Sequence, residues 1–208
     1  MKITKELNGA LTLALRDFIK FRRDKIRIIT SLIFPVLFIA VLGGSLQANI
    51  GKDAGYNFIV FTFTGVIGQT LFQSTASGII SLIEDRENDF AQEIFVSPIS
   101  RYTIIIGKIL GETLVSYAQV IGIFTLGLLL TIPLGLTQLS SMIIAGLACT
   151  FLGGAFGVLV LANLGSQRSA NQIFPFLIFP QFFLAGVFNP IKELPQALFI
   201  LSRLAPMT

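Results

Sequence analysis

Long apolar runs alternate with short polar segments along the chain, and this alternation predicts an all-α polytopic membrane protein. A helix needs roughly 20 apolar residues to cross the hydrocarbon core of a bilayer. Backbone groups inside a bilayer must pair within their own segment, so each such run is expected to be a helix. Five runs are long enough, at about residues 28–46, 57–83, 102–132, 139–164 and 172–188.

The first 27 residues predict a cytoplasmic amphipathic helix that lies in the membrane interface, because apolar and basic residues alternate there with helical spacing. The apolar stripe consists of Ile3, Leu7, Leu11, Ala14, Phe18 and Phe21. The opposite face consists of Lys5, Thr12, Arg16, Lys20, Arg23 and Arg27. The charged region is too long for a cleavable signal peptide. A soluble helix packed on a partner protein is the alternative.

One polar segment, residues 84–101, separates the second and third apolar runs and holds five of the eleven acidic residues. Phe90, Ile94 and Phe95 lie among these charges. Ser97-Pro98 ends any helix there, because proline lacks an N–H and restricts the residue before it. A plain solvated connector does not need such apolar side chains. The segment therefore has the features of a docking surface, and an ordinary polar connector is the alternative.

Polar and small residues recur every four positions within the second apolar run. Gln69, Gln73 and Ser77 share one helical face, which makes them candidates for a substrate path through the membrane. Side-chain amides and hydroxyls also hold helices together by hydrogen bonds, so helix packing is the alternative. In the fourth run, Gly153 and Gly157 have the spacing of a close helix contact.

Composition narrows the possible chemistry. Only 12% of the 208 residues are charged, there is no histidine, and Cys149 is the single cysteine. A disulfide within the chain and a Ser-His-Asp triad are thereby excluded, and a His/Cys metal site is disfavoured. No phosphate-binding or dinucleotide-binding glycine motif occurs. We expect no catalytic, cofactor-binding or metal-binding residue, and no nucleic-acid partner.

Two further patterns concern energy supply and orientation. Four of the five apolar runs contain no ionisable residue, whereas ion-driven carriers commonly place such groups in mid-membrane. In the third run Lys108 and Glu112 are four residues apart, where they could pair or extend to the interface.

With a cytoplasmic N-terminus, twelve Lys and Arg residues lie on the cytoplasmic side and three on the outer side (Lys52, Lys192 and Arg203). Membrane proteins favour an excess of basic residues on the cytoplasmic side.

These features together resemble the membrane subunit of type-2 ATP-binding-cassette (ABC) exporters, close to the permeases of multidrug resistance and polysaccharide export. The resemblance covers essentially the whole chain. Its most specific stretches are Glu84-Asp85-Arg86-Glu87, Val96-Ser97-Pro98-Ile99-Ser100-Arg101, Gly107-Lys108, Phe179-Pro180, Leu184-Ala185-Gly186-Val187-Phe188 and Leu204-Ala205-Pro206-Met207-Thr208. The basic amphipathic helix before the first span also fits.

The resemblance implies a transmembrane permease without its own ATPase site. It would move a drug-like, lipid or glycan substrate out of the cytoplasm, in the plasma (inner) membrane of a prokaryote. ATP and Mg would be bound by cytosolic ABC ATPase subunits, and a second permease subunit would complete a homodimer or heterodimer. ATPase coupling would fall to Glu84, Asp85, Arg86, Glu87, Asp89, Phe90, Glu93, Ile94, Phe95, Ser97, Pro98 and Arg101.

The resemblance also implies six spans, with residues 189–208 forming an extracytoplasmic re-entrant segment after the fifth. The transmembrane domain would then cover residues 28–208, and we expect the sixth span to follow Thr208. Asp89 departs from the family, which often has glycine there. A membrane-embedded assembly protein that binds a cytoplasmic partner without transport is the main alternative. An ion channel is disfavoured, because the spans lack charge rings.

Overall fold

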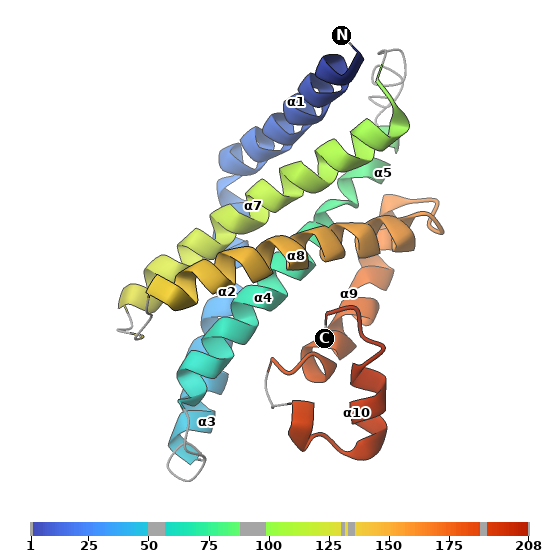
Figure 1. Cartoon of the computed structure of the whole chain (residues 1–208). Coiled ribbons are helices and arrows are strands. Elements are labelled where there is room, and N and C mark those ends of the chain that lie inside the picture. Colours follow the sequence, from blue (N-terminus) through green and yellow to red (C-terminus); the bar gives the residue numbers. More distant parts are fainter. Residues whose placement is uncertain are drawn as a thin grey trace.

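The computed structural model describes residues 2–49, 57–87, 99–129, 132, 136–187 and 191–207, and in these ranges its regular structure is helical (Figure 1). The longer helices are α1 (Lys2–Arg23), α2 (Lys25–Leu37), α4 (Phe58–Gly78), α7 (Arg101–Leu129), α8 (Leu136–Leu161) and α9 (Gln167–Leu184). The shorter ones are η1 (Phe38–Gly43), α3 (Gly44–Asn49), α5 (Ser81–Glu87), η2 (Ile191–Glu193) and α10 (Gln196–Ser202). The all-α prediction is confirmed.

Four helical stretches are long and apolar enough to cross a membrane, which confirms four of the five predicted spans. They are Lys25–Asn49, Phe58–Glu87, Arg101–Leu129 and Gln138–Leu161. The fifth predicted span corresponds to α9, an 18-residue helix that contains Pro175 and Pro180 and is not among these four. A fifth crossing therefore stays a prediction. The segment after it forms η2 and α10, and its re-entrant placement also stays a prediction.

The first span is longer than predicted. The predicted run ended at about residue 46, but α3 continues the helix to Asn49. Gly44 takes helical geometry, with φ of −65°, and does not break the helix. Pro35 lies inside α2, and the wider π-helical turn η1 begins three residues after it. Proline and π-turns are both established causes of helix irregularity.

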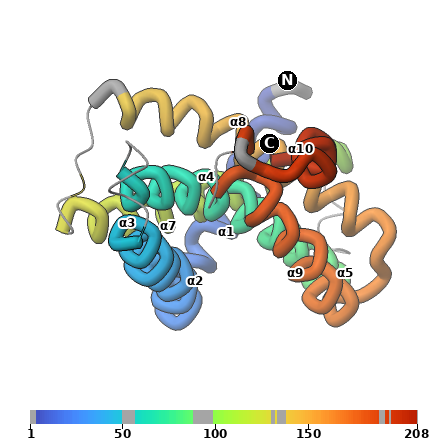
Figure 2. Tube along the Cα trace, turned by 90° about the horizontal axis from the view of Figure 1, so that it is seen from below, coloured from blue at the N-terminus to red at the C-terminus, as the bar shows by residue number. Residues whose placement is uncertain are grey.

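Helix α4 is the centre of the bundle. About 67% of its apolar stretch is buried, against 17–39% for the other three spans. Seen from below, α4 lies between α8 on one side and α2 with α3 on the other (Figure 2). Two apolar clusters form around it. One is centred on Phe72 and joins α8 and α9, and the other is centred on Phe63 and joins η1 and α7.

Glycines allow the closest helix contacts, as the spacing of Gly153 and Gly157 predicted. A Cβ atom placed on Gly157 of α8 would lie 2.6 Å from the carbonyl oxygen of Ala76 in α4. Gly107 of α7 likewise faces the backbone of Ala10 in α1, where a Cβ would lie 2.9 Å from the carbonyl oxygen. Both helix pairs thus pack backbone against backbone, as small residues permit in membranes.

Helix α1 buries only part of the predicted apolar stripe, because Ala14 and Phe21 of that stripe face inward but its leucines do not. Ala10, Ala14 and Phe21 are buried, whereas Leu7 and Leu11 are exposed. The reason is that small side chains let α1 approach α7, which turns the larger leucines outward. Leu15 and Ile19 extend this exposed row. The row suits the interfacial placement expected of α1, which itself stays a prediction.

We predict that Gly157→Ala lowers the stability of the protein, because the backbone of α4 must move to admit one methyl group. Overpacking of this kind costs about 1–3 kcal/mol. Gly44→Ala is the matched control, because a Cβ there meets no described atom within 4 Å. Thermal unfolding in detergent or nanodiscs measures both variants. Equal midpoints for the two would show that α4 and α8 are not closely packed.

Candidate functional site

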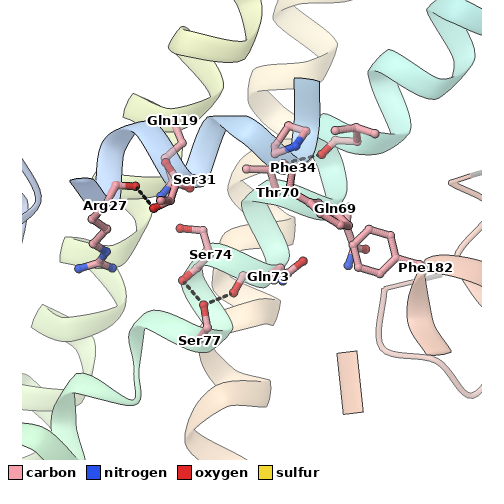
Figure 3. A pocket seen from close by; sticks show the side chains of 13 residues that line it. Arg27, Ser31, Phe34, Gln69, Thr70, Gln73, Ser74, Ser77, Gln119 and Phe182 are labelled. Carbon is pink, nitrogen blue, oxygen red and sulfur yellow. Dashed lines mark hydrogen bonds between the residues drawn. The ribbon is translucent and has the colours of Figure 1, made fainter. Parts of the chain in front are cut away.

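A polar pocket of about 330 Å³ lies between α2, α4, α7 and α9. The three candidate substrate-path residues, Gln69, Gln73 and Ser77, all line it from α4 (Figure 3). The rest of its lining consists of Arg27, Thr30, Ser31, Phe34, Pro35, Val66, Thr70, Ser74, Gln119 and Phe182. The structure thus brings the predicted polar face of the second span to a single cavity.

The hydroxyl and amide groups of the pocket differ in how they are hydrogen-bonded. Thr30, Ser31, Thr70 and Ser77 each donate their hydroxyl proton to a carbonyl oxygen of their own helix, at 2.7–2.9 Å. Gln69 is only 2% exposed, and neither its amide nitrogen nor its amide oxygen has a partner among the described residues. A buried amide without partners is costly, so this side chain is poised for a group that enters the pocket.

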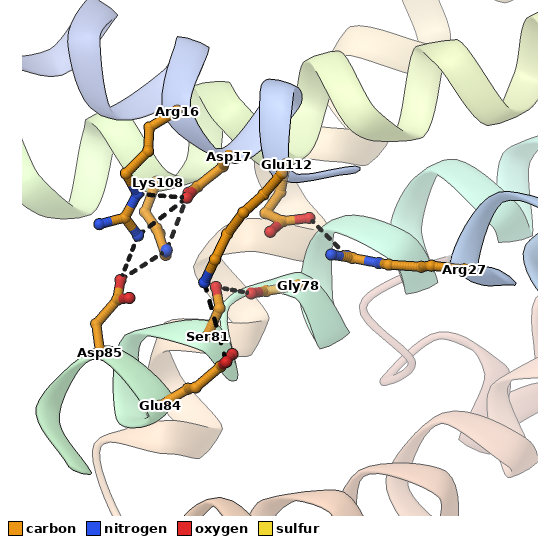
Figure 4. Close-up of polar contacts among 10 residues, drawn as sticks. Arg16, Asp17, Arg27, Gly78, Ser81, Glu84, Asp85, Lys108 and Glu112 are labelled. Carbon is orange, nitrogen blue, oxygen red and sulfur yellow. Dashed lines mark hydrogen bonds and ion pairs between the residues drawn. The ribbon is translucent and has the colours of Figure 1, made fainter. Parts of the chain in front are cut away.

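A second polar feature is an ion-pair cluster that joins α1, α5 and α7 (Figure 4). Lys108 Nζ lies 2.9 Å from Asp17 Oδ2 and 2.9 Å from Asp85 Oδ2. Arg16 Nη2 lies 2.6 Å from the same Asp85 oxygen and 3.1 Å from Asp17 Oδ1. Two positive and two negative charges therefore compensate one another where Lys108, Asp17 and Asp85 are all buried.

Within this ion-pair cluster, Arg16 is firmly cationic. Burial alone would lower the pKa of its guanidinium, but the hydrogen bond from Arg16 to Asp85 and the charges of Asp17 and Asp85 raise it instead. The guanidinium also donates through Nε to Asp17 at 3.2 Å. Arginine is suited to such a place, because its planar fork can bind two carboxylates at once.

Lys108 and Glu112 do not pair with each other, although their spacing permitted it. Lys108 contacts the two aspartates, and Glu112 Oε2 lies 3.6 Å from Arg27 Nη2, at the edge of the polar pocket. Neither side chain extends to the protein surface, because Lys108 is 1% and Glu112 2% exposed; their position relative to the membrane interface stays a prediction. Gly78 makes room for Glu112, since a Cβ there would overlap the carboxylate.

The predicted coupling residues fall into three groups. Asp85 is buried in the ion-pair cluster, and Glu84 lies 3.9 Å from Lys20 of α1. Arg86, Glu87 and Arg101 are exposed; the Glu87 carboxylate accepts a hydrogen bond from the Gln167 backbone N–H at 2.9 Å. The remaining predictions lie outside the described residues, namely Asp89, Phe90, Glu93, Ile94, Phe95, Ser97 and Pro98.

Two residues of α1 that were not predicted from the sequence as site residues hold α1 to the other helices. Asp17 completes the ion-pair cluster, and the Glu6 carboxylate accepts hydrogen bonds from the Ser100 N–H at 3.0 Å and from the Thr103 hydroxyl. A signal for Asp17 was present, because it lies on the same helical face as Ala10, Ala14 and Phe21. An acidic residue on an inward face requires a buried cation, and Lys108 lies well inside the apolar helix α7.

Comparison with known proteins supports the resemblance noted in the sequence. Residues 9–208 match the family model described as "ABC-2 type transporter". A protein named "Putative transport permease ycf38" from Cyanophora paradoxa is 26% identical over 199 residues, which cover 93% of this chain and 68% of that protein. No solved structure matches the chain.

We predict that Lys108→Met strongly destabilises the protein, because the two buried aspartates would then have Arg16 as the one remaining cation of the ion-pair cluster. Removing one partner of a buried pair costs about 3–5 kcal/mol. Lys20→Met is the control, because the Lys20–Glu84 pair is long and largely exposed and contributes roughly 0–1 kcal/mol. Adding Asp17→Asn to Lys108→Met restores part of the loss. Chemical denaturation in detergent micelles measures all three variants, and a Lys108 effect no larger than that of Lys20 contradicts the prediction.

Proposed function

Because this chain belongs to the ABC-2 type transporter family, we propose that it is the permease subunit of an exporter whose ATP is hydrolysed by a separate subunit. The family match over residues 9–208 is the observation that carries the proposal. The chain is a multi-pass membrane protein with four helices able to span a bilayer. Export of a drug-like, lipid or glycan substrate then needs a polar path among these helices.

The polar pocket supports such a path. Gln69, Gln73 and Ser77 line a partly open pocket between α2, α4, α7 and α9. A membrane-embedded polar cavity is unfavourable unless it accepts a ligand or water, because unpaired polar groups cost free energy there. We assign substrate contact to these residues. Drug efflux, and hence multidrug resistance, is one form of this activity.

The energy would enter through residues 84–101, which we assign to ABC ATPase contact. The first described part of this segment is the end of α5, and the ion-pair cluster holds α5 to α1 and α7. A displacement of α5 would therefore move three helices together. Partners of the complex would be cytosolic ATPase subunits with their ATP and Mg, a second permease subunit and the bilayer. The chain itself would supply no cofactor-binding or catalytic residue.

Reconstitution tests the export function directly. The permease is inserted into vesicles with the ABC ATPase encoded nearest to it, and movement of lipid, glycolipid and drug-like compounds is followed with and without ATP. ATP-dependent movement of any one of these classes supports the proposal. Stable association of permease and ATPase without ATP-dependent movement would favour the assembly-protein alternative.

We predict that Phe90→Ala or Ile94→Ala weakens ATPase association while leaving membrane insertion intact. Each apolar side chain that enters a groove on the partner contributes roughly 25 cal/mol per Å² of buried apolar area. Leu129→Ala is a matched control, because Leu129 is 76% exposed at the far end of α7. Co-purification and ATP hydrolysis measure the effect. Unchanged association in both variants would make the segment a spacer and α1 the better docking candidate.

A cytoplasmic N-terminus is the predicted orientation, in the inner membrane of a prokaryote. In a Cys149→Ser background, a cysteine at Lys192 should react with an impermeant maleimide added outside the cell, whereas a cysteine at Arg86 should react only after the membrane is opened. Both positions are exposed at the protein surface. The reverse pattern of labelling would overturn the orientation.

A further inference from the structure

A second cavity of different character adjoins the polar pocket. This second cavity has a volume of about 300 Å³ and shares Phe34, Gln73, Ser77 and Phe182 with the polar pocket. Its other lining residues are mostly apolar: Ile80, Asn171, Phe174, Pro175, Ile178 and Phe179. The two cavities are thus adjacent, and we treat them as a polar chamber and an apolar chamber, each near the lower end of the usual size of ligand pockets.

Phe34 and Phe182 mark the boundary between the chambers. Their rings meet edge to face, with centroids 5.8 Å apart. Phe34 comes from α2 and Phe182 from α9, so the boundary is formed by two helices that are distant in the sequence. A ligand that fills both chambers must pass this ring pair. Its polar part would lie against α4 and its apolar part against α9.

The polar chamber selects by hydrogen bonding. The Gln69 amide offers two donors and an acceptor, none of them used by a described residue. The hydroxyls of Thr70 and Ser77 donate to their own helix, and each hydroxyl oxygen keeps its capacity to accept a hydrogen bond. Groups that donate and accept at once, such as hydroxyls and amides, fit this arrangement best.

The charges around the polar chamber disfavour an ionic head. Of the described residues that line it, Arg27 alone is charged, and its guanidinium lies 3.6 Å from the buried Glu112 carboxylate. An anionic head would compete with Glu112 for Arg27. A cationic head would find no acidic side chain in the described lining and would lie near a cation, which is unfavourable in a weakly screened site.

We propose that the two-chamber site binds an amphiphile with an uncharged, hydroxyl- or amide-rich head and a single apolar chain. The head occupies the polar chamber at Gln69, and the chain occupies the apolar chamber along α9. This assignment rests on the proposed export function, because it names the substrate class of the same pocket. It separates neutral glycolipid-like compounds from the cationic drugs and anionic lipids that an exporter could also carry.

Binding is measured on the permease alone, in phosphatidylcholine nanodiscs without ATPase or nucleotide. Three probes share a ten-carbon chain: decyl maltoside (neutral), decyl sulfate (anionic) and decyltrimethylammonium (cationic). Each is titrated below its micelle concentration by calorimetry, and empty nanodiscs correct for partition into lipid. We expect saturable binding of decyl maltoside, and at least about tenfold weaker binding of both ionic probes.

Gln69→Leu tests the amide, because leucine has a similar size but cannot hydrogen-bond. We expect roughly tenfold weaker or no binding of decyl maltoside. Without bound probe, Gln69→Leu should unfold at a higher temperature than wild type, because a buried amide without hydrogen-bond partners has been removed. A purely structural glutamine would not show this combination. Gln172→Leu is the control, because Gln172 is exposed on α9 and lines neither chamber.

Four results would overturn the inference: no saturable binding of decyl maltoside, equal or tighter binding of decyl sulfate, equal or tighter binding of decyltrimethylammonium, or unchanged binding in Gln69→Leu. None of them bears on ATP-linked export, which the vesicle assay tests separately. If decyl maltoside binds saturably but the vesicle assay shows no ATP-dependent movement of any compound, the proposed export function is contradicted and the binding site still stands.

Discussion

The mutual neutralisation of Lys108 and Arg16 by Asp17 and Asp85 is the constraint on which the N-terminal half of the protein depends. Lys108 lies within a spanning helix and is almost fully buried, so its ammonium group must be compensated by neighbouring carboxylates. Those carboxylates come from α1 and α5, which fixes both helices against α7. Gly107 and Gly111, on either side of Lys108 in the sequence, bring α1 close enough for the contact.

Much of the fold could be predicted from the sequence, because length and apolar composition determine what can cross a bilayer. The contact between α4 and α8 was also predictable, since Gly153 and Gly157 allow the backbones of two helices to approach more closely than most residues permit. The extension of the first span to Asn49 was not predicted, because polar residues such as Gln47 and Asn49 do not show from composition alone whether a helix continues. The buried face of α1 was predicted only in part, since Ala14 and Phe21 are buried as expected but Leu7 and Leu11 are exposed. Hydrophobicity ranks leucine above alanine, but close packing against α7 favours alanine.

The candidate site was only partly predictable. The four-residue spacing of Gln69, Gln73 and Ser77 placed them on one face, and the structure shows that this face lines a cavity. Spacing could not show which helices close that cavity, because Phe34 and Phe182 come from distant parts of the chain. The partners of Lys108 were hidden for the same reason. Lys108 pairs with Asp85 and Asp17, which are 23 and 91 residues away in the sequence, and such pairs form only when the helices pack. The sequence by itself suggested the local pair with Glu112.

The composition of the ion-pair cluster has an electrical consequence. Arg16 and Lys108 contribute two positive charges, and Asp17 and Asp85 two negative ones, so the four side chains together carry no net charge. The membrane potential performs work on a moving charge of about 2.3 kcal/mol per elementary charge per 100 mV. A neutral group of side chains escapes this work when it moves. The ion-pair cluster therefore adds no net charge for the membrane potential to act on when α1, α5 and α7 shift, and any voltage dependence of that motion would come from the other charges on these helices.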